Sequence, residues 1–506
     1  MDSIAATGSS NSSIPTPHPN TPHPNTQVTH GTSAQPADAP PVESCAQLSI
    51  AIVGAGFAGL ACGYELQKSG ILASIFEASD RTGGRCWSMG GSFGEGERFP
   101  GQVVERGGEL IDSQHHQLLH YAQEFGLELE DLSATPGDWT FYFQGSHYPE
   151  SSVVEEYLDF LQAIQSDLAQ LSPEPTARQH TDFDRALDRI SIAEYLDKYD
   201  VGPLARGYIN ASYQGEFGFD PQDQTCLHFL LMNVEQQENP LEIFSDERYH
   251  IAGGNEQITR ALTDRLRDQI QLQHRLVKAK RTSSGRIELT FETHGKTIAQ
   301  TFDAVVMTVP FPALRSVDLD ESLELPDWKR RAIAELDNGA QVKMMVGFAG
   351  RPWQDHASNG VSHSDLPHHQ VTWEASPTLA TPDRSVIVHL ASGHLASRLS
   401  PDRLQQDSQD FLEDFDRIYP GAQARARRDP QGKIHSHLEP WITHPFAQGA
   451  YLCYRPGQFT AFTGLEGTSV GNLLFAGEHT HSFYEWQGFL EGAALSGIEA
   501  ARQLLR

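Results

Sequence analysis

The first regular pattern of apolar and polar positions begins near residue 48. The apolar run at 49–53 predicts a short buried strand, and the spacing of apolar residues over 60–68 predicts a helix after it. A second apolar run at 73–76 predicts another strand, which ends at Glu77. Together these segments predict a strand–helix–strand unit with parallel strands.

Three glycines occupy the turn between the first strand and the helix. Gly54, Gly56 and Gly59 follow the spacing G-x-G-x-x-G. In this spacing the first glycine allows a tight turn, the second lets a pyrophosphate approach the backbone, and the third lets helix and strand pack closely. The helix N-terminus offers free N–H groups to that phosphate, and Glu77 suits hydrogen bonds to an adenosine ribose. Because the strand, the helix and the acid agree, we favour dinucleotide binding over a glycine-rich turn without a ligand.

The remaining chain alternates between helical and extended patterns. Residues 111–248 are mostly helical in pattern, with helices expected at 114–125, 152–171 and 191–199. Strands are expected at 270–276, 286–292, 304–309 and 341–348, and the residues after 435 return to the cofactor-binding fold. The alternation indicates an α/β chain with two interleaved domains, one that binds a dinucleotide and one that binds the substrate.

Residues 1–46 differ in composition from the rest of the chain. They are rich in Ser, Thr, Pro, Asn and His, and repeat PHPNT at 17–21 and 22–26. Because few apolar residues offset the entropy of ordering, we predict a disordered tail. The segment does not have the charged and apolar regions of a signal peptide.

The formal net charge of −29 restricts the classes of partner. No basic stripe offsets it, which argues against nucleic acid, whereas an acidic field attracts cations such as protonated amines. Solubility is the alternative explanation of the same acidity. No apolar run reaches membrane-spanning length. The five cysteines form no C-x-x-C pair, so we expect reduced thiols and a cytoplasmic location.

Four separated motifs resemble the flavin amine oxidase family, which includes monoamine oxidases, polyamine oxidases and L-amino acid oxidases. The first motif is the glycine turn with Glu77 and R-x-G-G-R at 81–85. The second is ERGGELID at 105–112, and the third is the strand at 341–348 that carries Lys343. The fourth runs from LFAGE at 474–478 to GFLEG at 488–492. Their order and spacing resemble the family pattern from about residue 48 onward.

The resemblance implies the amine oxidase fold, in which a Rossmann-like FAD-binding domain is interleaved with an α+β substrate-binding domain. We expect the FAD-binding domain at 47–110, 250–325 and 436–506, and the substrate-binding domain at 111–249 and 326–435. FAD is the implied cofactor. Besides the glycine turn and Glu77, the implied FAD-binding residues are Arg81, Gly84, Arg85, Gly108, Glu109, Leu276, Gly477 and Glu478. Leu276 stands where the family usually has a valine whose backbone bonds the adenine ring.

The resemblance assigns the chemistry to Lys343. The family places a lysine at this position, bridged by water to flavin N5, where it assists reoxidation by dioxygen. Val342, Met344, Val346 and Phe348 alternate on the opposite face of the predicted strand. The alternative is a lysine exposed on a half-solvated strand.

Four residues are implied substrate contacts. Asp112 matches an acid that meets the substrate ammonium group in polyamine oxidases, although Asp112 or Ser113 could instead cap the helix at 114–125. Tyr451 and Phe489 match two aromatic positions that flank the amine in monoamine oxidases, where both are usually tyrosine. Trp486 is a further candidate contact.

Ala450 bears on how the cofactor is held. Monoamine oxidases with covalent flavin have a cysteine just before the tyrosine matched by Tyr451, and this chain has Ala450 there. We therefore predict non-covalent FAD. The implied reaction oxidises an amine C–N bond to an imine by hydride transfer to flavin N5, followed by hydrolysis and by reoxidation with O2 to give H2O2. The expected partners are a small-molecule amine and O2, with no membrane and with a homodimer as a candidate assembly.

Three other functions share parts of the pattern. An L-amino acid oxidase would need a cation for the substrate carboxylate, for which Arg206, Arg248 and Arg455 are candidates. A carotenoid or porphyrinogen dehydrogenase would share the FAD motif but would not be expected to carry Lys343. A flavin-binding regulatory or scaffold protein would keep the fold with a silent site, and the presence of Lys343, Tyr451 and Trp486 argues against it.

Overall fold

Five short parallel strands form the sheet that carries the glycine-rich turn. β1 lies at its centre and pairs in parallel with β13 on one side and β2 on the other. Strands from distant parts of the sequence meet in this sheet, as the predicted return of the chain to one fold requires. The order is β22 (Leu473–Phe475), β13 (Ala304–Met307), β1 (Ile50–Val53), β2 (Ser74–Phe76) and β9 (Ile270–Gln271).

The coordinates are a computed structural model, in which residues 48–506 form one compact unit. It describes these residues except 235–239, 242–244, 376–382 and 482–485, so the predicted tail at 1–46 lies outside the described residues. No helix within the described ranges is long and apolar enough to cross a bilayer. The four cysteines that are described, Cys62, Cys86, Cys226 and Cys453, are buried free thiols.

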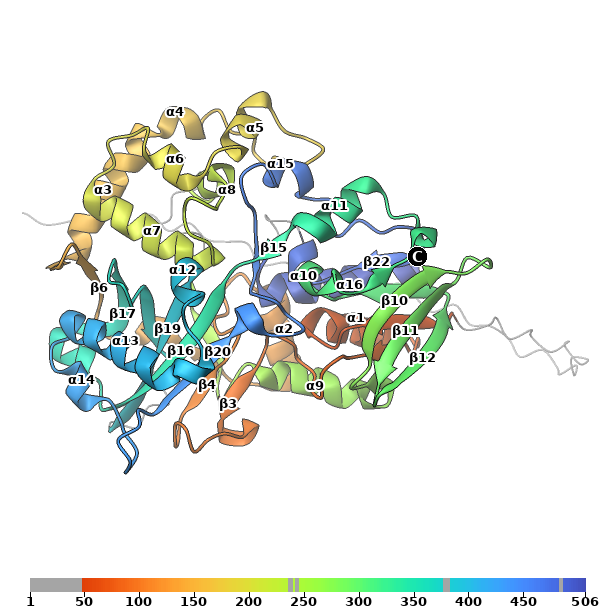
Figure 1. Ribbon diagram of the computed structural model, residues 1–506, viewed down its shortest axis with the longest axis horizontal. Coiled ribbons are helices and arrows are strands. Elements are labelled where there is room, and N and C mark those ends of the chain that lie inside the picture. Colours follow the sequence, from red (N-terminus) through yellow and green to blue (C-terminus); the bar gives the residue numbers. More distant parts are fainter. Residues whose placement is uncertain (1–47, 235–239, 242–244, 376–382, 482–485) are drawn as a thin grey trace, which may run out of the picture. The chain divides into compact units, whose positions relative to one another are not determined.

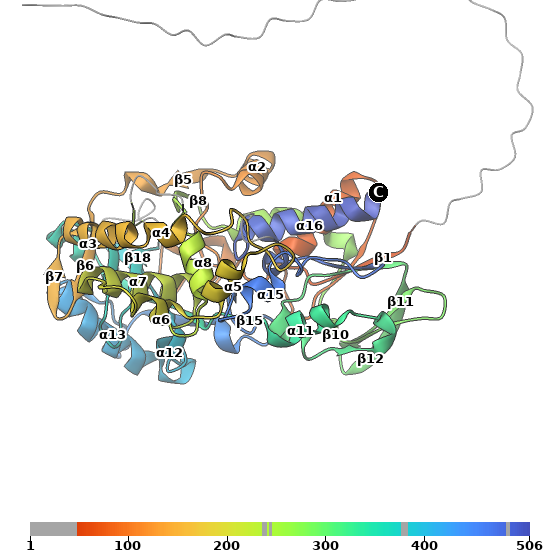
Figure 2. The ribbon, with the colours of Figure 1, turned by 90° about the horizontal axis from the view of Figure 1, so that it is seen from above.

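Helices cover one face of the parallel sheet, and another sheet with three antiparallel strands covers the other (Figure 2). Ile50 and Ile52 of β1 pack in the core formed with α1 (Phe57–Lys68), α9 (Glu256–Leu266) and α16 (Leu490–Leu505). Ala51 and Val53 point the other way. Their side of the core includes residues of β10 (Arg275–Arg281), β11 (Ile287–Thr293) and β12 (Lys296–Phe302). The alternation of β1 therefore sets the two layers that enclose the sheet.

A second, mixed sheet of seven strands lies beside the first, with β16 and β19 to the left of β22 in Figure 1. β16 is the second strand and pairs antiparallel with both β19 and β20. Residues 436–440 form β20 and therefore lie in this sheet. The domain boundaries expected from the sequence stay a prediction. The order is β20 (Ser436–Pro440), β16 (Gln341–Ala349), β19 (Arg384–Ser392), β18 (Val371–Glu374), β17 (Ser358–Ser364), β6 (Asp138–Phe143) and β7 (Ser146–Tyr148).

β16 is buried on both faces. Val342, Met344, Val346 and Phe348 pack on one side, in a core with residues of α13 (Leu404–Ile418), as the alternation predicts. Lys343 on the other side is also buried. The alternative of a half-solvated strand is therefore wrong, because the sheet lies between layers on both sides.

Two helices, α3 (Glu150–Ala163) and α7 (Pro203–Phe217), pack against the second sheet. α8 (Cys226–Leu231) packs beside α3, where the rings of Phe229 and Phe160 stack with centroids 6.2 Å apart. Tyr157 of α3 and Tyr208 of α7 make an edge-to-face contact with ring centroids 5.6 Å apart. α7 ends where Gly218 adopts a left-handed conformation with φ 75°. The last turn of α7 thereby reaches Gln341 of β16, whose side chain donates to the carbonyl of Gly215 at 2.8 Å.

Two predicted elements differ in the structure. The predicted strand at 270–276 is two strands, β9 and β10, which belong to different sheets. A turn separates them, with Gln273 at φ 57° and the His274 N–H donating to the Glu77 carbonyl. The predicted helix at 152–171 is interrupted after α3 and continues as α4 (Gln165–Leu168).

Candidate active site

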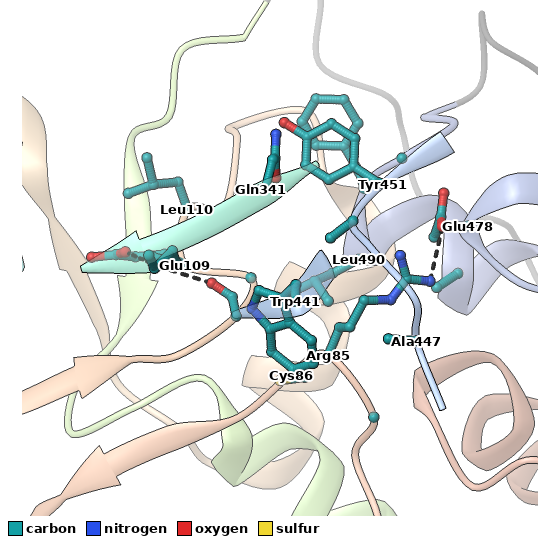
Figure 3. A pocket seen from close by; sticks show the side chains of 18 of the residues that line it. Arg85, Cys86, Glu109, Leu110, Gln341, Trp441, Ala447, Tyr451, Glu478 and Leu490 are labelled. Atoms are coloured by element: carbon teal, nitrogen blue, oxygen red, sulfur yellow. Dashed lines mark hydrogen bonds and ion pairs between the residues drawn. The ribbon is translucent and has the colours of Figure 1, made fainter. Parts of the chain in front are cut away.

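A cavity of about 1020 Å³ runs from the glycine turn to the second sheet (Figure 3). Every predicted site residue lines it except Gly59 and Trp486. The βα turn, the loop after β4 (Val103–Glu105), strand β16 and the segment around α16 contribute to the same wall. The cavity thus joins the predicted cofactor residues to the predicted substrate residues.

The glycine turn is shaped as its spacing predicts. Gly54 has φ 110°, a conformation that side chains disfavour. A Cβ on Gly59 would lie 2.0 Å from the Gly54 carbonyl oxygen, so Gly59 is required for helix and strand to pack. A Cβ on Gly56 would meet only the Gly84 Cα, at 3.9 Å, and Gly56 lines the cavity. The open space at Gly56 fits the close approach of a pyrophosphate, which is the test that a dinucleotide cofactor must pass.

Glu77 holds this turn and also borders the cavity. One carboxylate oxygen accepts from the Ala55 N–H at 2.8 Å, and the other accepts from the Ser79 N–H at 2.9 Å. The carboxylate is therefore fixed at the end of β2, beside the turn. This position agrees with the predicted contact to an adenosine ribose.

Leu276 lies where the pairing of β10 with β11 is interrupted. The register shifts between Leu276 and Lys278, and Leu276 lines the cavity. An irregular strand leaves backbone groups outside the ladder. This geometry suits the predicted backbone contact to adenine.

Two arginines of the R-x-G-G-R motif have different surroundings. The Arg81 guanidinium lies 3.8 Å from the centre of the Trp87 ring and donates to the Thr82 carbonyl at 2.9 Å. Arg85 forms an ion pair of 2.8 Å with Glu478, which follows the left-handed Gly477 (Figure 3). Both arginines line the cavity, so they fit the predicted phosphate and flavin contacts.

Lys343 and Glu109 form an ion pair in the wall of the cavity. Its Nζ donates to Oε2 of Glu109 at 2.5 Å and to the Gly107 carbonyl at 3.0 Å. The same Nζ lies 5.5 Å from the centre of the Trp373 ring. Glu109, expected to bind FAD, thus has a lysine as its immediate partner.

Asp112 faces the cavity and does not cap a helix. α2 (His116–Phe125) begins after it, and its N-cap His115 makes no side-chain capping bond, so the capping alternatives for Asp112 and Ser113 are wrong. Oδ1 of Asp112 instead accepts from the Ser245 hydroxyl at 2.7 Å and from the Glu247 N–H at 3.2 Å. Burial raises the pKa of Asp112 to about 6.

Six acids that sequence reasoning missed are among the described residues that line the cavity, namely Asp138, Glu150, Glu216, Asp246, Glu247 and Glu374. Burial raises the pKa of Glu216 to about 7, and it raises the pKa of Glu247 well above the ordinary value. Glu216 occupies the last turn of α7, where the helical pattern gives no signal of function. Glu247 precedes the strand β8 (Tyr249–Ile251) at φ 43°, a conformation that the sequence does not reveal.

Of the three predicted aromatic contacts, two line the cavity and the third packs behind them. Tyr451 and Phe489 line the cavity, and the Tyr451 hydroxyl lies 3.3 Å from a Glu216 carboxylate oxygen. Trp486 lies behind this wall, edge-on to Phe489 with centroids 5.7 Å apart and edge-on to His115 at 4.7 Å. It packs against Phe489 and is not among the described lining residues, and its contact with substrate stays a prediction.

Comparison with known proteins decides the family. The model of flavin-containing amine oxidoreductases matches residues 57–505. The chain belongs to this family. It is 23% identical over 467 residues to the L-amino-acid oxidase of Pseudechis australis, covering 90% of this chain and 86% of that protein. It is 25% identical over 485 residues to the pseudooxynicotine dehydrogenase of a Pseudomonas species, covering 92% and 87%.

Solved structures agree with this assignment at the level of the fold. Cyclohexylamine oxidase from Brevibacterium oxydans IH-35A superposes with a TM-score of 0.76 at 20% identity, covering 91% of this chain and all of that chain. The amine oxidase fold is thereby confirmed: a Rossmann-like parallel sheet beside a mixed sheet. The family implies FAD, and the open space at Gly56 and the Arg85–Glu478 pair in the cavity wall fit that cofactor.

Proposed function

We propose that this flavin-containing amine oxidoreductase oxidises the C–N bond of a small cationic amine to an imine, which water hydrolyses to an aldehyde. FAD, when bound, would accept the hydride at N5 and deliver the electrons to dioxygen, with hydrogen peroxide as product. The chain itself binds and orients the amine, receives its proton, and provides Lys343 beside the site of oxygen reduction.

The main support for this proposal is the set of acidic side chains that line the cavity. Besides Glu109, the acids that line the cavity include Asp112, Glu216, Asp246 and Glu247. The ammonium of Lys343 is already paired with Glu109. A nearby cation favours the ionised form of a buried carboxyl group and a nearby anion disfavours it, so these acids favour an ammonium ligand over a substrate with a free carboxylate.

The three arginines considered for a substrate carboxylate support an L-amino acid oxidase less well. Arg206 pairs with Asp197 at 3.0 Å, and Arg455 lies 3.4 Å from Asp223. Neither is among the described residues that line the cavity. Arg248 lines it, but its guanidinium pairs with Asp131 at 2.7 Å.

Glu216 supports a route for the proton. An amine binds as an ammonium ion at neutral pH but must be neutral to give up a hydride. Because the pKa of Glu216 is raised to about 7, its carboxylate is suited to accept that proton. Tyr451 and Phe489 in the same wall give the neutral nitrogen an aromatic surrounding. A flavin-binding scaffold protein with a silent site would need neither a proton acceptor nor an aromatic surrounding for an amine.

The proposal includes a dissociable cofactor and a reducing compartment. Ala450 has no nucleophile, and burial raises the pKa of the Cys86 thiol in the cavity wall well above its ordinary value. The four described cysteines are free, which supports a cytoplasmic enzyme. A homodimer is the candidate assembly, and light scattering of the purified protein tests it.

Anaerobic bleaching of the bound flavin tests the function directly. The holoenzyme is mixed without oxygen with putrescine, spermidine, phenethylamine or several L-amino acids, and the visible absorbance of the flavin is followed. Bleaching by amines is expected, with hydrogen peroxide formed when air is admitted. Bleaching by amino acids alone would move the assignment to L-amino acid oxidase. A flavin bleached by none of them would favour a dehydrogenase or a silent site.

A further inference from the structure

Lys343 and Glu109 form one of the most enclosed ion pairs of the cavity wall. The exposed fractions of their side chains are 6% and 4%. Taking an ammonium group out of water is costly unless an opposite charge and hydrogen bonds compensate. Glu109 supplies both at 2.5 Å. The carboxylate is therefore what permits a charged lysine at this point of β16.

The loop that delivers Glu109 depends on a pair of glycines. A Cβ on Gly107 would lie 1.7 Å from the Arg85 carbonyl oxygen, and one on Gly108 would lie 3.0 Å from the Leu490 side chain. The loop after β4 therefore passes tightly between these two residues. Asn255 donates to the Glu109 carbonyl at 2.7 Å and fixes its backbone. The close packing of Gly107 and Gly108 and the hydrogen bond from Asn255 therefore fix the position of the Glu109 carboxylate.

The hydrogen bonds that Lys343 makes leave one of its N–H donors for the cavity. An ammonium group has three N–H donors. Among the described residues, Glu109 and the Gly107 carbonyl accept two of them. Lys343 lines the cavity, so the third donor is available to water or to a ligand there.

We propose that Glu109 is a positioning residue for the oxidative half of the reaction, which holds Lys343 as an ammonium group at a fixed point of the cavity. The inference rests on the proposed function. Dioxygen takes up two electrons and two protons to become hydrogen peroxide, and negative charge develops on it with the first electron. A fixed positive charge in an enclosed site stabilises that charge without reorganisation. Glu109 acts through Lys343 and has no separate contact in the step.

The test separates the oxidative half-reaction from the substrate. The flavin of the holoenzyme is reduced photochemically in the absence of amine, then mixed with oxygenated buffer, and reoxidation is followed by absorbance. The E109Q variant keeps the shape of the side chain but removes its charge. Its reoxidation is expected to slow about tenfold or more, while the anaerobic rate of reduction by amine changes by less than about threefold.

A double-mutant cycle distinguishes positioning from direct action. If Glu109 acts only through Lys343, K343M and the K343M/E109Q double variant reoxidise at the same rate, because the second change has nothing left to act on. If Glu109 contacts the cofactor itself, E109Q slows reoxidation by the same factor in both backgrounds. That result, or an E109Q variant that reoxidises like the wild type, would overturn the inference.

Asp407→Asn is the matched control. Asp407 on α13 is also a buried carboxylate paired with a cation, Arg403, at 3.2 Å, and neither is among the described residues that line the cavity. Its substitution removes an equivalent charge pair and is expected to leave reoxidation within about twofold of wild type. The FAD dissociation constant and the visible spectrum are recorded for each variant, so that loss of cofactor is not mistaken for slow reoxidation.

Failure of the proposed function and failure of the Glu109 inference give different results. A wild-type flavin that no amine bleaches but that reoxidises rapidly after photoreduction contradicts the amine oxidase proposal and leaves the Glu109 test intact. If E109Q does not retain FAD, E109D takes its place, since it keeps the charge and shortens the side chain by one methylene. Reoxidation of E109D at the wild-type rate would then contradict positioning.

Discussion

The hydroxyl of Tyr451 lies 3.3 Å from Oε1 of Glu216, in the wall of the cavity. Burial raises the pKa of Glu216 to about 7, the hydrogen bond from Tyr451 lowers it, and the nearby charge of Asp112 raises it. A group that gains and loses its proton near neutral pH is well matched to proton transfer. The contact thus joins the aromatic wall of the site to a proton acceptor.

Substituting Glu216 by glutamine is expected to remove the proton acceptor. In the wild type the carboxylate form accepts the proton, so the anaerobic rate of flavin reduction by amine should rise as pH increases through about 7. In E216Q this rate falls about 100-fold, and the rise near pH 7 disappears. Stopped-flow reduction between pH 5.5 and 9 measures both effects. A variant that retains the rise would show that another group accepts the proton.

Tyr451→Phe tests the direction in which the hydrogen bond acts. Because that bond lowers the pKa of Glu216, its loss is expected to move the rise in reduction rate toward higher pH. The aromatic ring is kept, so packing changes little. Tyr195→Phe is the control, because the Tyr195 hydroxyl bonds to Asp167, and neither lines the cavity. A shift of equal size in both variants would indicate a general effect on the fold.

The same carboxyl predicts a pH-dependent stability. The pKa of Glu216 is raised from 4.5 to about 7 in the folded state, so its contribution is most favourable below about 4.5 and is lost as pH rises to about 7. The glutamine of the E216Q variant cannot ionise, and this variant therefore gains stability relative to wild type as pH rises from 4.5 to 7. Denaturant unfolding of the apoproteins at pH 5 and pH 8 checks this. A difference that is equal at both pH values would contradict the raised pKa.

The backbone of the cofactor side was predictable from sequence, whereas the acids of the substrate side other than Asp112 were not. Glycine spacing and strand alternation report local geometry, and Gly54, Gly56 and Lys343 accordingly lie where the motifs indicate. Glu216 occupies an ordinary helical pattern. Its burial arises because β16 and Tyr451, distant in sequence, pack over the end of α7. Trp486 is not among the described lining residues, because sequence does not distinguish a residue in a cavity wall from one that packs behind it.

Alanine at Gly56 and at Gly59 should separate binding from folding. The Cβ of G56A has open space, so the apoprotein should keep its stability within about 0.5 kcal/mol, while FAD affinity falls because the methyl group occupies the approach of the pyrophosphate. The Cβ of G59A would lie 2.0 Å from the Gly54 carbonyl oxygen, which should cost about 1–3 kcal/mol of stability.

Flavin titration of the two apoproteins, together with their unfolding curves, checks this contrast. Equal losses of stability in G56A and G59A would show that the space at Gly56 is structural. An unchanged FAD dissociation constant in G56A would show that the pyrophosphate does not pass that point.

The cofactor is expected to leave the denatured chain completely. A thioether to the flavin requires a thiolate at the cavity, since the thiolate is the nucleophile. Position 450 is alanine, and Cys86, the cysteine among the described lining residues, is 1% exposed with a thiol pKa that burial raises well above its ordinary value. Acid precipitation of the holoenzyme should therefore leave all yellow absorbance in the supernatant. The mass of the denatured chain should equal that of its sequence, and a chain heavier by one flavin would identify a covalent link that neither position explains.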